Sequence, residues 1–78
     1  MREKPIRAVK LRSEHILEVF SANGSVICLN MTPFLATVRF RLLADDAVWR
    51  SGTTDGIRVC WPGVAEMSYE EITQRAFW

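Results

Sequence analysis

The first half of the chain alternates between apolar and polar positions, a pattern typical of half-buried strands. The alternation begins after Pro5, so residues 1–5 are expected to be frayed. Over residues 6–12, apolar residues alternate imperfectly with basic ones, which predicts a first strand with one face in water. Residues 13–15 then form a short polar break.

Two further apolar runs and the dipeptide between them predict a β-hairpin. Residues 16–21 are rich in β-branched and aromatic residues, and residues 25–29 form the return run. Asn23-Gly24 separates the runs, and both residue types tolerate the positive φ values of a type I′ turn. The pattern therefore predicts a hairpin over residues 16–29.

The middle of the chain changes from strand periodicity to short helical pieces. Pro33 suits the first position of a helix capped by Asn30 or Thr32, but the pattern does not decide whether residues 33–37 form a helix or a turn. Residues 39–43 alternate charge and bulk, which is consistent with a connector or a short strand.

Turn and capping residues organise the segment that follows. Asp45 is expected to cap a brief helix over residues 46–50, which would bury Trp49. A second hairpin is expected over residues 53–61, because Asp55-Gly56 supplies its turn.

The last third predicts a strand that ends at Pro62-Gly63 and then a capped helix. Ser68 and Glu71 have the spacing of a capping box, in which the hydroxyl accepts from a backbone amide and the carboxylate reaches back. The helix should extend to about Ala76, with Glu71 on its water-facing side. We therefore predict a single α+β domain over residues 1–78, with a mainly antiparallel sheet of two β-hairpins plus a first strand, short helices between them and a capped C-terminal helix.

Composition adds a hypothesis about assembly. A domain of 78 residues buries only roughly 60% of the surface of its unfolded chain. Yet 49% of the residues are hydrophobic, including three Trp, four Phe and three Met. We expect another subunit to cover part of this apolar surface, which makes the protein a homo-oligomer; the alternative is an unusually large core. The interface candidates are Phe40, Trp49, Phe77 and Trp78.

Charge and apolar-run length bear on location and on charged partners. The formal net charge of +1 gives no global field that would favour nucleic acid or a membrane. A phosphate-binding edge near the N-terminus is the alternative to a solvated strand face, and its nucleic-acid candidates are Arg7, Lys10 and Arg12. No apolar run approaches the ~20 residues of a membrane span, and no apolar signal segment follows the basic start. We therefore expect a cytoplasmic protein with Cys28 and Cys60 as reduced, buried thiols.

No residue pattern predicts an active site, a metal site or a cofactor. His15 is the only histidine, and no spacing places it against Cys28 or Cys60 as a catalytic partner. These three residues also lack the clustered spacing of zinc ligands. We expect a non-enzymatic protein; the alternative is a small-ligand pocket where an aromatic ring and a carboxylate converge. Its candidates are Trp61, Glu66 and Tyr69.

Three motifs follow one another along residues 6–75. The first is Leu17-Glu18-Val19 leading to Asn23-Gly24; the second is Leu43-Ala44-Asp45-Asp46-Ala47-Val48-Trp49; the third is Trp61-Pro62 followed by Glu66-Met67-Ser68. In this order they resemble the DUF2442 family of small bacterial domains of unknown function. The chain departs from the family pattern at Ser21, Gly63-Val64 and Glu66.

The resemblance to the DUF2442 family implies an α+β fold and supplies no established catalytic residues. Some members of that family carry a DNA-binding helix-turn-helix after this domain, and others resemble the smaller half of toxin–antitoxin gene pairs. For this chain, the resemblance implies a protein-interaction module that is accessory to a partner protein or regulates it.

Overall fold

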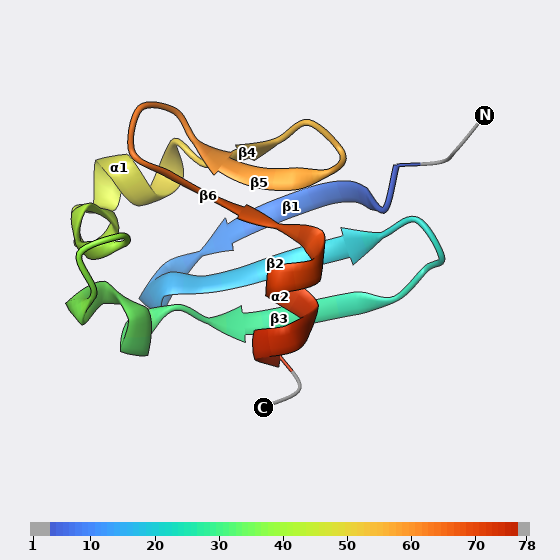
Figure 1. Ribbon diagram of the computed structural model, residues 1–78, viewed down its shortest axis with the longest axis horizontal. Helices are drawn as coiled ribbons and strands as arrows, with labels where there is room; N and C mark the ends of the chain where they lie inside the picture. The colour runs from blue at the N-terminus through green and yellow to red at the C-terminus, as the bar shows by residue number, and fades with distance from the viewer. Residues whose placement is uncertain (1–3, 77–78) are drawn as a thin grey trace.

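Two three-stranded antiparallel sheets form the framework of the computed structural model, which describes residues 4–76 (Figure 1). Sheet A has the strand order β1-β2-β3, with β1 at Ile6–Arg12, β2 at Ile16–Ser21 and β3 at Val26–Asn30. Sheet B has the order β4-β5-β6, with β4 at Thr53–Thr54, β5 at Arg58–Trp61 and β6 at Ala65–Ser68. The helical elements are the 3-10 helices η1 (Ser13–His15), η2 (Thr32–Ala36) and η3 (Arg41–Ala44), helix α1 (Asp46–Arg50) and helix α2 (Tyr69–Ala76). The predicted α+β fold class is confirmed.

The β2–β3 hairpin is confirmed, but its turn is not type I′. Gly24 N donates to Ser21 O (3.1 Å), and Ser21 N donates to Ser25 O (2.8 Å), so the loop has three residues. Gly24 has a φ of 92°, whereas the backbone of Asn23 stays outside the positive-φ region. The Asn23 side chain instead accepts a hydrogen bond from Ser25 N (2.9 Å). A type I turn followed by a positive-φ glycine is the usual geometry of such a loop.

Two short 3-10 helices replace the features left open in the middle of the chain. Helix η2 contains Pro33 in its first turn, but its N-cap position is Met31 and no side chain caps it, so the predicted cap by Asn30 or Thr32 is wrong. Asn30 Oδ1 does accept from the N–H of Thr32, the first residue of the helix (3.0 Å). Residues 39–43 form a turn and most of η3, so a strand in this segment is wrong.

Asp45 caps helix α1 as predicted. Its Oδ1 accepts hydrogen bonds from Ala47 N (2.9 Å) and Val48 N (3.3 Å), which satisfies amides that the first helical turn leaves without partners. The cap fixes the start of α1, and Trp49 then points into the core, where it is 1% exposed.

Sheet B contains the predicted hairpin and a third strand that the sequence did not reveal. The hairpin pairs β4 with β5 around Asp55-Gly56. Pro62-Gly63 does end β5, through a turn in which Val64 N donates to Trp61 O (2.9 Å) and Gly63 has a φ of 75°. A proline followed by a positive-φ glycine is typical of a type II turn, and this turn leads the chain directly into β6.

The predicted capping box of α2 is only half formed. Ser68 Oγ accepts from Glu71 N (3.1 Å), as expected for the cap. The Glu71 carboxylate does not reach back to the cap, because it binds Arg39 instead, and its side chain is only 22% exposed. The expectation that Glu71 faces water is therefore wrong. The helix extends at least to Ala76, the last residue that the structure describes.

The core lies against the inner face of sheet A, which α2 crosses in front of β2 and β3 (Figure 1). Phe40 and Trp49 are 2% and 1% exposed, so their prediction as subunit contacts is wrong: this chain's own elements cover them. Trp61 is also fully buried; its ring stacks on that of Trp49 at 5.7 Å between centroids, and its Nε1 donates to Trp49 O (3.0 Å). The other two interface candidates, Phe77 and Trp78, lie outside the described residues. No helix in residues 4–76 is both long and apolar enough to span a membrane.

Candidate interaction surface

The outer face of sheet A carries the side chains that alternate with those of the core. The inward residues of β2 and β3 are almost completely buried, whereas Val26 on the outer face is 52% exposed and Ile16 and Phe20 are half-buried. An apolar band of Ala8, Phe20 and Val26 thus crosses one end of the face, next to a row that contains Lys10 and Glu18. The members of the face are Ala8, Lys10, Arg12, Ile16, Glu18, Phe20, Val26, Cys28 and Asn30.

The basic residues of β1 do not form a continuous cationic surface. Lys10 lies over the Phe20 ring, with Nζ 5.6 Å from its centroid. Arg12 Nη1 is 3.2 Å from Glu18 Oε1, and Glu18 lies directly opposite Lys10 in the register of β1 and β2. Arg7 is exposed beside a register shift between β1 and β2. The structure brings the three nucleic-acid candidates onto one strand, but a carboxylate lies among them.

Strand β3 forms one edge of sheet A, and hydrogen bonds at its two ends fix which groups face outward. Ser21 N donates to Ser25 O (2.8 Å), and Met31 N donates to His15 O (2.9 Å). Bonded and non-bonded pairs alternate along antiparallel strands, so between these ends the odd-numbered residues of β3 bond to β2. The even-numbered residues direct their N–H and C=O groups away from β2, where nothing in residues 4–76 pairs with them. We call these backbone groups, from Val26, Cys28 and Asn30, the open edge.

The other sheet edges are short, irregular in register or partly bonded to other groups. Strand β1 is joined to the β4–β5 turn by a bond from Ile6 N to Gly56 O (2.9 Å), and its register is irregular near Arg7. Strand β4 has two residues. On β6, the Arg39 side chain donates to the Glu66 carbonyl. Irregularity, short length and charge are the usual protections of an edge, and β3 has none of them: it has five residues, a regular register, no proline and no charge.

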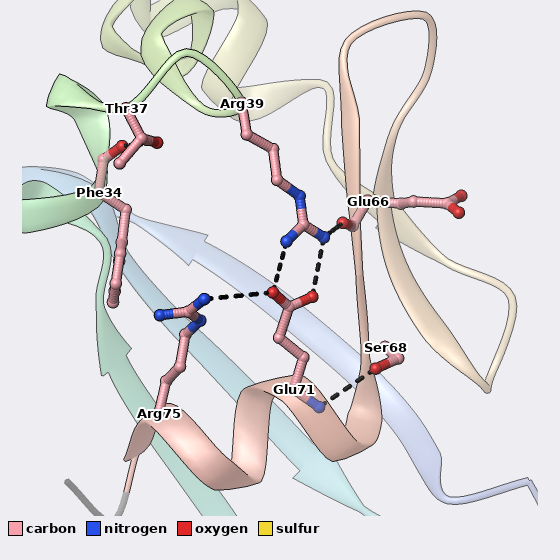
Figure 2. Close-up of polar contacts among 7 residues, drawn as sticks. All are labelled: Phe34, Thr37, Arg39, Glu66, Ser68, Glu71 and Arg75. Atoms are coloured by element: carbon pink, nitrogen blue, oxygen red, sulfur yellow. Dashed lines mark hydrogen bonds and ion pairs between the residues drawn. The ribbon is translucent and has the colours of Figure 1, made fainter.

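A cluster around Glu71 ties the connector after η2 to helix α2 (Figure 2). The Arg39 guanidinium binds the Glu71 carboxylate with both terminal nitrogens, and the Nη2–Oε1 contact is 2.8 Å. The same Nη2 donates to the Glu66 carbonyl, while Arg75 Nη2 lies 3.5 Å from Glu71 Oε2. We call Arg39 and Glu71 the clasp, because together they link the connector at Arg39 to β6 and α2, which follow one another in the chain but whose bonded residues lie at least 27 positions away from it.

The electrostatics of the clasp favour stability over proton transfer. The hydrogen bonds from Arg39 hold the pKa of the Glu71 carboxyl below its usual value, and the same bonds raise the pKa of Arg39. Both groups therefore stay ionised near neutral pH, and the carboxylate is a weak base with its oxygens occupied. Sequence reasoning missed Arg39 because its partner lies 32 positions away and no local pattern connects them.

The ligand-pocket candidates do not converge. Trp61 is fully buried and its indole donor is used within the core. Glu66 is exposed and its carboxylate lies 3.4 Å from Arg58 Nη1. The Tyr69 hydroxyl bonds to Ser21 Oγ (3.0 Å) beside a hollow of about 240 Å³, to whose lining neither Trp61 nor Glu66 contributes.

The residues considered for nucleophilic or metal chemistry are also separated. His15 bonds through Nε2 to the Leu43 carbonyl (2.7 Å) and packs on Trp49. Cys28 is exposed on the outer face and Cys60 is half-buried, so the prediction of buried thiols is wrong for Cys28. No group of three or more His, Cys, Asp or Glu within residues 4–76 is arranged to hold a metal ion.

Comparison with known proteins gives no relative from which a function could be transferred. No family model, curated protein or solved structure matches the chain. The similarity to the DUF2442 family therefore remains a prediction from the order of the motifs.

Proposed function

We propose that this protein is a non-enzymatic interaction module that self-associates through sheet A. The observation that carries this proposal is the open edge of β3, which lies beside the apolar band of the outer face. An unprotected edge offers a row of unsatisfied backbone donors and acceptors to another strand. The exposed Val26 side chain next to it adds apolar area that a partner would remove from water.

The polar groups of the described chain support binding more than catalysis. The clasp carboxylate is held ionised by Arg39, and the His15 ring is bonded to a backbone carbonyl. General acid–base catalysis needs a group that can exchange a proton near the working pH and reach a substrate. The Glu71 carboxylate and the His15 ring are both bonded to other groups of this chain, and these bonds stabilise the fold.

The biological role that we propose is accessory or regulatory and cytoplasmic. The similarity of the three motifs to the DUF2442 family supports this role, because some members of that family resemble the smaller half of toxin–antitoxin pairs. The self-associated protein would then present its surface to a partner protein rather than to a substrate.

Light scattering coupled to size-exclusion chromatography over a range of protein concentrations tests self-association. The wild type should show a mass above that of the single chain, which is 8.9 kDa. Val26→Lys places a charge on the outer face beside the open edge and should shift the protein to monomer. Val38→Lys is the matched control, because Val38 is 83% exposed and lies outside both sheets. A wild type that stays monomeric at every concentration would refute the proposal.

A further inference from the structure

We infer that β3 pairs antiparallel with β3 of a second copy of this chain, about a twofold axis at Cys28. This inference rests on the proposed self-association and specifies its geometry. The result is one continuous sheet of six strands, with β3 and its copy at the centre. Six strands is an ordinary sheet size, so the assembly needs no unusual architecture.

The register follows from the outward backbone groups. The open edge is symmetric about Cys28, with Val26 two residues before it and Asn30 two residues after it. Centring the axis on Cys28 opposes it to Cys28 of the second copy and opposes Val26 to Asn30, so all three outward residues form bonded pairs. A shift by one residue would place outward groups against inward ones, and a shift by two would leave one residue unpaired. The edge is therefore complementary to itself in one register.

The chemistry of β3 suits pairing with an identical strand. Its sequence, Val-Ile-Cys-Leu-Asn, carries no charge, so two copies meet without like-charge repulsion. A twofold axis perpendicular to the sheet keeps both outer faces on the same side. On this face the two Cys28 side chains meet at the axis, and Val26 of each copy lies opposite Asn30 of the other. Within one chain α2 crosses β3 on the inner face (Figure 1), so the twofold axis would place both α2 helices on that side of the sheet.

Amide hydrogen exchange measured by NMR tests the register on the unmodified protein. The amides of Ile27 and Leu29 bond to β2 within one chain and should be protected at any concentration. Those of Val26, Cys28 and Asn30 should exchange at least about tenfold more slowly at a concentration that populates the dimer than at one that does not. A dimer in which these three amides exchange freely would overturn the inference.

Thiol cross-linking gives an independent readout at the axis. In a Cys60→Ser variant, a short bismaleimide should join two chains through Cys28, each thiolate adding to one maleimide. A Cys28→Ser variant keeps the half-buried Cys60 and should give no cross-linked dimer. A linked product through Cys60, or a dimer whose Cys28 thiols react only singly, contradicts the register while leaving self-association intact. A protein that is monomeric throughout contradicts both this inference and the proposed function.

Discussion

Breaking the clasp between Arg39 and Glu71 should destabilise the fold by a measurable coupling energy. The two side chains join the connector between η2 and η3 to helix α2. The perturbation is a double-mutant cycle with Arg39→Ala, Glu71→Gln and the double variant. Glu71→Gln leaves the backbone amide free to donate to Ser68 Oγ, so the helix cap is kept.

The expected magnitude follows from exposure. A hydrogen bond to a charged group contributes about 1.5–3 kcal/mol, whereas an exposed ion pair contributes about 0.2–1 kcal/mol. Arg39 is 46% exposed and Glu71 22% exposed, which places this bidentate pair between the two cases. We expect a coupling energy of about 1–1.5 kcal/mol. Arg39→Ala alone should cost about 2 kcal/mol, because it also loses the bond to the Glu66 carbonyl and the contact over the Phe40 ring.

Urea unfolding of the four proteins at neutral pH gives the free energies of unfolding from which the coupling energy is calculated. In thermal unfolding of the same proteins, each 1 kcal/mol should appear as a shift of about 4–8 °C in melting temperature. The contribution also has a defined pH dependence. The pKa of Glu71 is lowered in the folded state, so the stabilisation is fully present above the ordinary carboxyl pKa, about 4, and is lost as the pH falls through the folded pKa.

The pair of Asp46 and Arg50 on helix α1 is the matched control. Its charges also lie 2.8 Å apart, but the side chains are 72% and 65% exposed. The same cycle there should give about 0.3–0.5 kcal/mol, as for other exposed pairs four residues apart in a helix. Equal coupling in the two pairs, or additive effects of Arg39→Ala and Glu71→Gln, would refute the assignment of a stabilising clasp.

Two further predictions concern the cap of α1 and the packing around Trp61. Asp45→Ala should destabilise by about 1 kcal/mol in urea unfolding, whereas Asp45→Asn, which keeps the accepting oxygen, should cost much less; equal losses would contradict the capping role. Gly52→Ala should cost about 1–3 kcal/mol, because its Cβ would lie 2.7 Å from Trp61 Nε1. Trp61→Phe removes that nearest atom, so Gly52→Ala should cost less in its presence, and thermal unfolding that shows purely additive losses would exclude this clash.

Local signals in the sequence predicted the elements whose stabilising contacts are themselves local. The Asp45 side chain bonds amides two and three residues ahead, and the Asn23-Gly24 loop closes within five residues. Such contacts depend on residue types a few positions apart, which a sequence displays directly. Even there, the turn type was missed because Asn23 uses its side chain to bond Ser25 instead of adopting a positive φ.

Contacts between distant segments were not predicted, because they depend on residues that are far apart in the sequence. The capping-box spacing predicted that the Glu71 carboxylate would bind back at the helix cap beside Ser68. It instead binds the guanidinium of Arg39, which lies 32 positions away in the sequence. Strand β6 was missed because its four residues show too short an alternation to be distinguished from a loop, and it is stable through pairing with β5. In both cases the deciding partner lies in another element.

The high aromatic content of the sequence and the open edge of β3 point to different residues as the basis of assembly. Composition suggested that Phe40 and Trp49 would contact another subunit. Trp49 is instead buried within one chain, where its ring stacks on Trp61 and its indole N–H donates to the Arg12 carbonyl. Those side chains are already removed from water, so they leave no driving force for association. The outward backbone groups of β3, an uncharged edge strand, by contrast have no partner within residues 4–76. Assembly of this protein should therefore depend on the register of β3 more than on its aromatic content.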